Sequence, residues 1–267
     1  HINTINKNKK FNSFNGAVGF KTDITSKIIG RINLASGFRA PNLAELTSDG
    51  EHEGSNRYEI GNLDLTNEQN SQLDLNLNYK SDHFEFFVNG FYNSINDYIY
   101  LNPTSEYIED AQVFKYLQES ASLYGGELGI HLHPHPLDWL HINSSFETVT
   151  GKLKNGAYLP LIPANSIHTN LTFTVTKNSK LNTDAFISLK NVFKQQNVSG
   201  DEISSENYDL VNLGVKSELQ TKKALYKFNI GVNNLLDKQY INHLSRLKND
   251  GIYNQGRNII LGLTIKL

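Results

Sequence analysis

Apolar and polar residues alternate along most of the chain. From Gln72 to Tyr79 the alternation is unbroken, and from Ile259 to Leu267 every second residue is aliphatic. Alternation with a period of two predicts β-strands that have one apolar face and one polar face. No long segment of the sequence has the spacing of an amphipathic helix. The pattern therefore predicts an all-β protein.

The pattern predicts eleven strands, joined by connections that alternate between short and long. The strands cover residues 11–21, 28–38, 71–79, 84–101, 113–133, 138–150, 166–176, 181–193, 208–219, 225–235 and 257–267. The long connections are expected at 39–70, 102–112, 151–165, 194–207 and 236–256. Short turns at one end of the strands and long loops at the other are typical of transmembrane β-barrels.

The two faces of the strands fit the same interpretation. Leu73, Leu75 and Leu77 are expected to face lipid, while the polar residues between them face a wet lumen. Aromatic residues gather near both ends of the strands, as interfacial girdles require. Trp139 is out of phase with the apolar residues that follow it, so it is expected in a bulge or below the membrane. A soluble β-rich protein with core aromatics is the alternative.

Composition narrows the function classes. The 267 residues include 25 Lys+Arg and 27 Asp+Glu, a net charge of −2 that excludes a strongly basic nucleic-acid-binding protein. The absence of cysteine excludes disulfides, thiol catalysis and zinc–thiolate sites. The sequence contains no run of 18 apolar residues, so it predicts no membrane-spanning helix. Hydrolase and nucleotide-binding motifs are absent from the sequence, so neither an enzyme nor a cofactor is expected.

Three segments resemble one known family. Residues 36–46, SGFRAPNLAEL, are similar to the FRAP-box region of TonB-dependent outer-membrane receptors, and residues 52–65 resemble the segment that follows it. Residues 232–240, VNNLLDKQY, with the final alternating strand, resemble the closing hairpin of that family. Leu63 and Asn67 stand where the family usually has prolines, and Leu267 replaces its usual terminal Phe.

This resemblance implies a transmembrane antiparallel up-and-down β-barrel of 22 strands with an internal plug, in the outer membrane of a Gram-negative bacterium. The chain is expected to supply the C-terminal 11 or so strands, with residues 1–267 as one partial barrel domain without a plug. Alone it is expected to form an open sheet that transports nothing. The family's C-terminus is periplasmic, so the long connections are expected outside the cell.

The implied function is active uptake of a scarce metal complex: an iron–siderophore, haem or zinc. The implied partners are the TonB complex, reached through the plug, outer-membrane lipid and the cargo itself, but no nucleic acid. A passive outer-membrane porin and a soluble β-rich binding module or adhesin are the alternatives from other function classes.

The longest loop contains the strongest candidate ligands. Glu51, His52 and Glu53 combine an imidazole with two carboxylates, a set suited to zinc or iron, and haem receptors of the family carry an axial His in this interval. Arg57 and His243 are further candidate cargo contacts, Arg57 because its guanidinium binds anionic groups in a bidentate manner. The alternative is an ordinary solvated loop.

The histidines at 131, 133 and 135 are interpreted differently. His131 and His133 share one strand face, but Pro134 and Pro136 place His135 in a turn. The run is therefore predicted to be a structural turn. Arg39 of the FRAP box, likewise, is expected to hold the base of its loop or contact the plug.

The first testable prediction concerns His52. In the full-length receptor, His52→Ala should weaken binding of the metal or haem by about 10-fold or more, about 1.4 kcal/mol, because a coordinate bond is lost. Neutral imidazole is the binding form, so wild-type affinity should fall below about pH 6. Binding of zinc, haem and ferric siderophores by both proteins checks this. Barrel assembly should not change, and equal affinities for all three cargoes would remove His52 from the site.

Overall fold

The computed structural model describes residues 9–52, 57–200 and 202–267, apart from the side chain of His52. The chain forms one short helix, α1 (Leu43–Thr47), and thirteen strands. The strands are β1 (Gly16–Thr25), β2 (Ile28–Arg39), β3 (Asp49–His52), β4 (Arg57–Ile60), β5 (Glu68–Lys80), β6 (Phe84–Ile108), β7 (Ala111–Leu132), β8 (Leu140–Leu153), β9 (Ser166–Lys177), β10 (Leu181–Val192), β11 (Tyr208–Gln220), β12 (Leu225–Asn233) and β13 (Asn258–Lys266).

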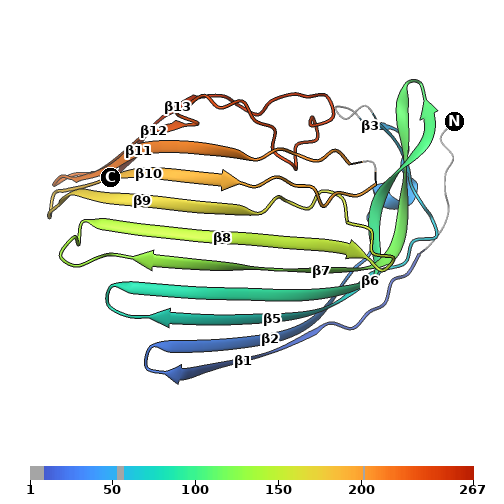
Figure 1. The fold of residues 1–267 in the computed structure, drawn as a ribbon, viewed down its shortest axis with the longest axis horizontal. Helices are drawn as coiled ribbons and strands as arrows, with labels where there is room; N and C mark the ends of the chain where they lie inside the picture. The colour runs from blue at the N-terminus through green and yellow to red at the C-terminus, as the bar shows by residue number, and fades with distance from the viewer. Residues whose placement is uncertain (1–8, 53–56, 201) are drawn as a thin grey trace.

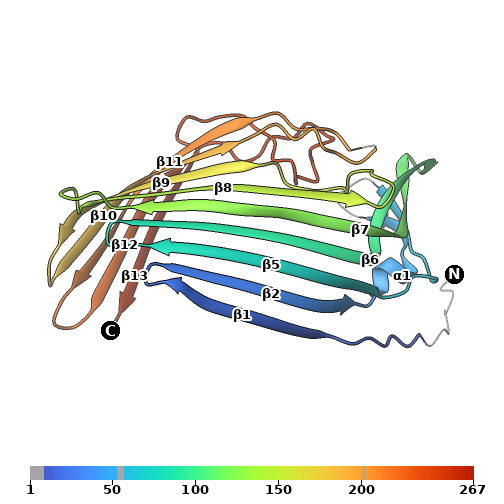
Figure 2. The same cartoon turned by 60° about the horizontal axis from the view of Figure 1, so that its bottom comes forward.

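Eleven of these strands make one long antiparallel sheet in the order β1-β2-β5-β6-β7-β8-β9-β10-β11-β12-β13. Each pairs with the next of the eleven, and only between β2 and β5 do other strands, β3 and β4, intervene in the sequence. The sheet is curved, with short turns at one end of the strands and long loops at the other (Figures 1 and 2). β1 and β13 lie at its two edges. The predicted all-β architecture and its eleven strands are confirmed. The first strand lies later than predicted, at Gly16–Thr25.

One face of the sheet carries an apolar band. Residues that lie directly opposite on neighbouring strands point to the same side. One such row runs from β7 to β13 and consists of Leu132, Ile142, Leu171, Ile187, Leu213, Val232 and Ile259. Several of these residues are exposed, and the exposed fraction of Ile259 is 66%. A broad exposed apolar band is the surface that a barrel presents to lipid.

The opposite face is polar. The same register connects Asn76, Asn89, Glu127, Glu147, Ser166, Val192 and Tyr208 across successive strands from β5 to β11. This side, called the polar face below, is the one that a barrel turns toward its lumen. Among the described residues, no helix is long and apolar enough to cross a membrane.

The segment 102–112 is not the loop that the sequence predicts. β6 and β7 remain paired until a two-residue turn at Glu109 and Asp110. Both turn residues have positive φ, 49° and 67°, which is the backbone that a tight hairpin turn requires. Their sequence, Glu-Asp rather than Asn-Gly, gives a weak turn signal, so the prediction missed the long hairpin. The hairpin rises away from the sheet at the long-loop end (Figure 1).

The segment 39–70, also predicted to be a loop, is partly ordered into α1, β3 and β4. The side chain of Asn42 accepts a hydrogen bond from the backbone of Glu45, whose carboxylate accepts one from the Asn42 backbone. This reciprocal cap makes a helix of only five residues begin sharply. β4 pairs in parallel with β7, so this segment is attached to the long β6–β7 hairpin.

Trp139 lies in the turn before β8, outside the regular strand, which explains its phase. Its ring stacks on that of Phe173, with 6.1 Å between the centroids. Phe173 lies directly opposite Leu140, the first residue of β8, so Trp139 lies at the short-turn border of the apolar band. Its place in the turn, and not a bulge within β8, accounts for the phase that the sequence leaves unexplained.

Arg39 holds the base of its loop, as predicted. Its guanidinium donates to Glu45 at 2.8 Å and to Glu68 at 2.7 Å. Both carboxylates are buried, and Glu68 also accepts a hydrogen bond of 2.7 Å from the Ile99 backbone. One cation therefore joins the end of β2, α1, and the start of β5. The contacts with the two carboxylates raise the pKa of Arg39, so it stays charged.

The second prediction follows from this junction. Arg39→Ala should destabilise the folded barrel by roughly 1–3 kcal/mol, because it leaves two buried carboxylates without their charge-assisted donor. Arg39→Lys should recover only part of the loss, because an ammonium lacks the planar fork that serves both partners. The temperature at which the heat-modifiable gel band shifts in detergent measures stability.

Arg31→Ala is the matched control, since Arg31 is an exposed arginine on the same strand. An equal loss of stability in both alanine variants would show that the ion pairs of Arg39 contribute nothing specific.

Candidate functional site

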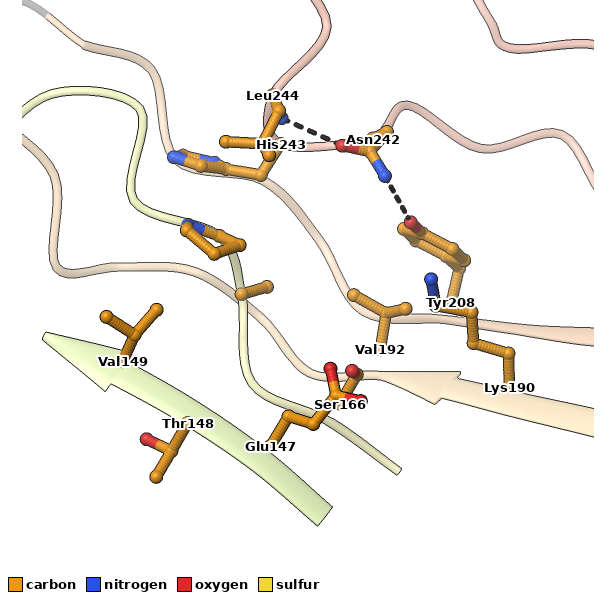
Figure 3. Close-up of a pocket in the computed structure, with 12 residues that line it drawn as sticks. Glu147, Thr148, Val149, Ser166, Lys190, Val192, Tyr208, Asn242, His243 and Leu244 are labelled. Carbon is orange, nitrogen blue, oxygen red and sulfur yellow. Dashed lines mark hydrogen bonds between the residues drawn. The ribbon is translucent and has the colours of Figure 1, made fainter. Parts of the chain in front are cut away.

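A pocket of about 310 Å³ opens on the polar face where β8, β9, β10 and β11 meet the long loops. Figure 3 shows its lining side chains. They come from four strands and two loops: Glu147, Thr148, Val149, Pro163, Ala164, Ser166, Lys190, Val192, Tyr208, Asn242, His243 and Leu244. Because several of them lie in the polar cross-strand row, the sheet register itself places them on one side.

The connection between β12 and β13 covers this pocket. The Asn242 side chain donates a hydrogen bond of 3.2 Å to the Tyr208 hydroxyl, and its oxygen accepts one of 2.9 Å from the Leu244 backbone (Figure 3). The rings of Tyr208 and Tyr240 lie 4.5 Å apart. The roof is therefore fixed to the strand wall by both an aromatic contact and hydrogen bonds.

The walls mix charge and hydroxyl groups. Glu147 of β8 and Lys190 of β10 are both pocket residues, and Ser166 lies between their strands on β9. A carboxylate, an ammonium and hydroxyl groups around a partly apolar floor provide both donors and acceptors. Such a lining favours a small polar ligand with groups of both kinds.

A buried ionic cluster lies behind the roof. Glu202 Oε1 is 3.3 Å from Lys248 Nζ and 3.2 Å from His243 Nε2, the latter without hydrogen-bond geometry. Nδ1 of His243 is 3.1 Å from the Ser205 hydroxyl and 3.3 Å from Lys248 Nζ. His243 and Lys248 are only 2% and 8% exposed. Three ionisable groups thus meet in a nearly closed space, called the loop cluster below.

The charges of the loop cluster depend on each other. Burial disfavours the ionised form of Glu202, but its contacts with His243 and Lys248 outweigh burial and hold its pKa below the usual range. Burial lowers the pKa of Lys248, and Glu202 opposes that shift. The carboxylate is therefore the partner that keeps a buried ammonium charged.

The loop cluster joins three long connections. Glu202 and Ser205 belong to the β10–β11 connection, and His243 and Lys248 to the β12–β13 connection. The backbone N–H of Leu161, between β8 and β9, donates to Glu202 at 3.2 Å. The pocket roof is consequently supported by its neighbours rather than by its own segment alone.

The VNNLLDKQY motif forms the base of the roof. Asn234 and Asp237 have φ of 49° and 54°, a left-handed backbone that Asn and Asp tolerate. The Asp237 carboxylate accepts a hydrogen bond of 2.8 Å from the Arg257 backbone. A Cβ on Gly256 would lie 2.7 Å from that carboxylate. The glycine therefore permits the close approach that closes the loop.

The predicted ligands do not all meet. Glu51 is exposed on β3, opposite Tyr58, while the His52 side chain and Glu53 lie outside the described residues. Arg57 donates to Glu59 at 2.8 Å and lies over the ring of Phe114. Of the described members of this set, His243 alone lines the pocket. Whether any of the five binds cargo stays a prediction.

The histidine run at 131–135, predicted to be a structural turn, is one only in part, because His131 lies within β7 and His133 directly after it. His135 lies in the turn, and its side chain is 68% exposed. His131 and His133 come together with His141 of β8, whose position in the sequence gives no sign of this contact. Pairing of β7 with β8 places His141 beside this run, and only the register of that hairpin reveals it.

Comparison with known proteins identifies relatives of this fold. The family model described as "TonB dependent receptor-like, beta-barrel" matches residues 2–235. The copper transporter OprC superposes with a TM-score of 0.74 at 21% identity, covering 92% of this chain and 38% of that one. The FrpB iron transporter from Neisseria meningitidis superposes with a TM-score of 0.66 at 16% identity, covering 93% of this chain and 38% of that one. The siderophore receptor PirA from Acinetobacter baumannii superposes with a TM-score of 0.65 at 16% identity, covering 92% of this chain and 40% of that one. The chain thus spans about two fifths of the length of these proteins.

The third prediction tests the loop cluster. Glu202→Ala should lower the free energy of opening the pocket roof by roughly 1–3 kcal/mol, because Lys248 stays buried without its counter-ion. Hydrogen exchange of amides in 234–257 and 157–165 should accelerate about 5-fold or more, while exchange in β8 to β11 stays unchanged.

Glu206→Ala provides the control from the same connection. Glu206 is 73% exposed and pairs with Lys194 at the surface, where an ion pair contributes little. Roof exchange that is identical in both variants would show that the loop cluster does not hold the roof.

Proposed function

The chain belongs to the TonB-dependent receptor β-barrel family, and from this premise we propose that it acts as an outer-membrane uptake receptor for a scarce metal complex, energised by the TonB complex. Receptors of this family are transport proteins rather than enzymes. The observation that carries the proposal is the roofed pocket on the polar face. It lies at the long-loop end, where a barrel receives cargo from outside.

The two faces of the sheet support a membrane-embedded transport role. The apolar band from Leu132 to Ile259 suits contact with outer-membrane lipid, and the polar face suits a hydrated lumen. A soluble adhesin would have to leave this band in water. The long loops, gathered at the end opposite the short turns, form the receiving side.

The pocket chemistry favours a chelate over a bare ion. Its single imidazole, that of His243, is 2% exposed and already contacts Ser205 and Lys248. Lys190, Tyr208 and Asn242 instead offer groups for hydrogen bonding and charge pairing. An iron–siderophore or haem, whose organic groups present anionic oxygens, therefore fits this pocket better than zinc. The names of similar structures include transporters for copper and iron and a siderophore receptor.

A second cargo contact is proposed at the β3–β4 segment, with His52 as ligand and Glu51 and Glu53 as support. Arg57 would stand at its border. Position supports this proposal: the segment is attached to the β6–β7 hairpin, which extends beyond the sheet (Figure 1). Cargo held there first would then pass toward the pocket.

The fourth prediction tests transport and pocket together. Cells producing the receptor should accumulate radioactive iron from a ferric siderophore or haem only when TonB is active. Lys190→Ala should weaken binding of an anionic chelate by about 5- to 10-fold, because one charge-assisted contact is lost. Uptake rates and direct binding to purified receptor are the measurements.

Lys194→Ala serves as the matched control, since Lys194 pairs with Glu206 outside the pocket. It should leave binding within 2-fold of wild type. Uptake without TonB, together with a large single-channel conductance, would contradict the proposal and indicate a passive channel. Equal weakening by both lysine variants would remove the pocket from cargo binding.

A further inference from the structure

A histidine cluster lies at the end of the polar face opposite the pocket. His131 is near the end of β7, His133 follows directly after that strand, and His141 is the second residue of β8. The roofed pocket lies near the other end of β8, at Glu147 to Val149. The cluster is therefore near the short turns, away from the long loops where cargo would first bind.

The sheet register places these three side chains on the polar face. Asn78 lies opposite Phe87, and Phe87 opposite Gly129, so position 129 belongs to the same side as Asn78. His131 and His133 follow at spacings of two and share that side. On β8, Asn143 lies opposite His131, which puts Asn143 and His141 on the polar face as well.

The geometry is close to that of a metal-bound histidine set. One ring nitrogen from each of His131, His133 and His141 lies within 4.8 Å of the other two. Nε2 of His131 and Nδ1 of His141 are 3.3 Å apart. Two nitrogens that each lie 2.0–2.1 Å from a tetrahedral ion are themselves about 3.3 Å apart. His133 supplies the third ring nitrogen, within the same 4.8 Å.

Two positions of the cluster are held by secondary structure. His131 lies opposite Asn143 and His141 lies opposite Thr172, both within paired strands. The His133 backbone donates a hydrogen bond of 3.0 Å to the carbonyl of His83. The His83 ring packs edge-on against that of His133, with centroids 5.1 Å apart. Rigid strands fix ligand positions more precisely than a loop does.

The surroundings of the cluster are partly open. Glu85 of β6 lies directly opposite His131 and is ion-paired with Lys80. The three histidines are half-buried, neither closed off nor fully solvated. A site with three protein ligands and one open position is the arrangement that lets an ion exchange ligands.

We propose that His131, His133 and His141 form a binding site for a divalent transition-metal ion on the polar face at the short-turn end. Three imidazoles without a thiolate select borderline ions, Zn²⁺ and Cu²⁺ before Mg²⁺ or Ca²⁺. The site is independent of the roofed pocket, and it does not depend on the identity of the cargo.

The competing explanation is a purely structural contact. His131 and His141 also satisfy each other as a neutral donor and acceptor pair, with stacked rings whose centroids lie 5.6 Å apart. That contact requires no third histidine. The metal site does, so His133 distinguishes the two explanations.

The fifth prediction tests this site with Zn²⁺ alone, on receptor purified in detergent without a polyhistidine tag. Calorimetric titration should show about one equivalent of Zn²⁺ bound by wild type. His131→Gln, His133→Gln and His141→Gln should each weaken that binding by about 10-fold or more. Co²⁺ in place of Zn²⁺ should give a visible absorption spectrum of nitrogen coordination that the triple variant lacks.

Two histidine variants provide matched controls. His135→Gln changes an exposed ring in the same turn, and His168→Gln changes a ring elsewhere on the polar face whose Nε2 contacts Ser188. Both should bind Zn²⁺ within 2-fold of wild type. Undiminished Zn²⁺ binding in the triple variant, or unchanged binding in His133→Gln, would overturn the proposal. Because binding is measured without transport, failure here leaves the uptake proposal standing.

Discussion

One constraint underlies the whole structure: the continuous hydrogen-bonded register of an antiparallel sheet. Because residues opposite each other point to the same side, one choice of register separates an apolar band from a polar face across every strand from β5 to β13. A slip of a single residue in one strand would turn its aliphatic side chains into the lumen. The pocket walls and the histidine cluster both depend on this register, since their members come from different strands.

The strands of the large sheet could be predicted from the sequence, because their alternation of apolar and polar residues recurs along the chain. Eleven strands with alternating faces leave the same signal again and again, and that signal predicted most strand ends closely. The paired extension of β6 and β7 was not predicted, because the turn that joins them uses Glu109 and Asp110 in left-handed conformations, without the glycine that usually marks such a turn. Local chemistry there has no strong sequence signature.

The candidate site was much harder to predict from the sequence, because the residues that contact each other there lie far apart in the chain. Glu202 meets Lys248 across 46 residues, and Tyr208 meets Asn242 across 34. Periodicity carries no information about which loops touch. His243 was singled out for its residue type, yet its burial follows from the loops packed around it. His141 joined the histidine run only through strand register, which depends on a turn containing two prolines.

The loop cluster has a consequence for how this surface changes over generations. Here three loops share one buried carboxylate, and a substitution in one of them alters the electrostatic environment of the others. Loss of the acid would have to coincide with loss of the ammonium 46 residues away. We therefore expect Glu202 and Lys248 to change together in related sequences, while the exposed Glu206 varies independently of them.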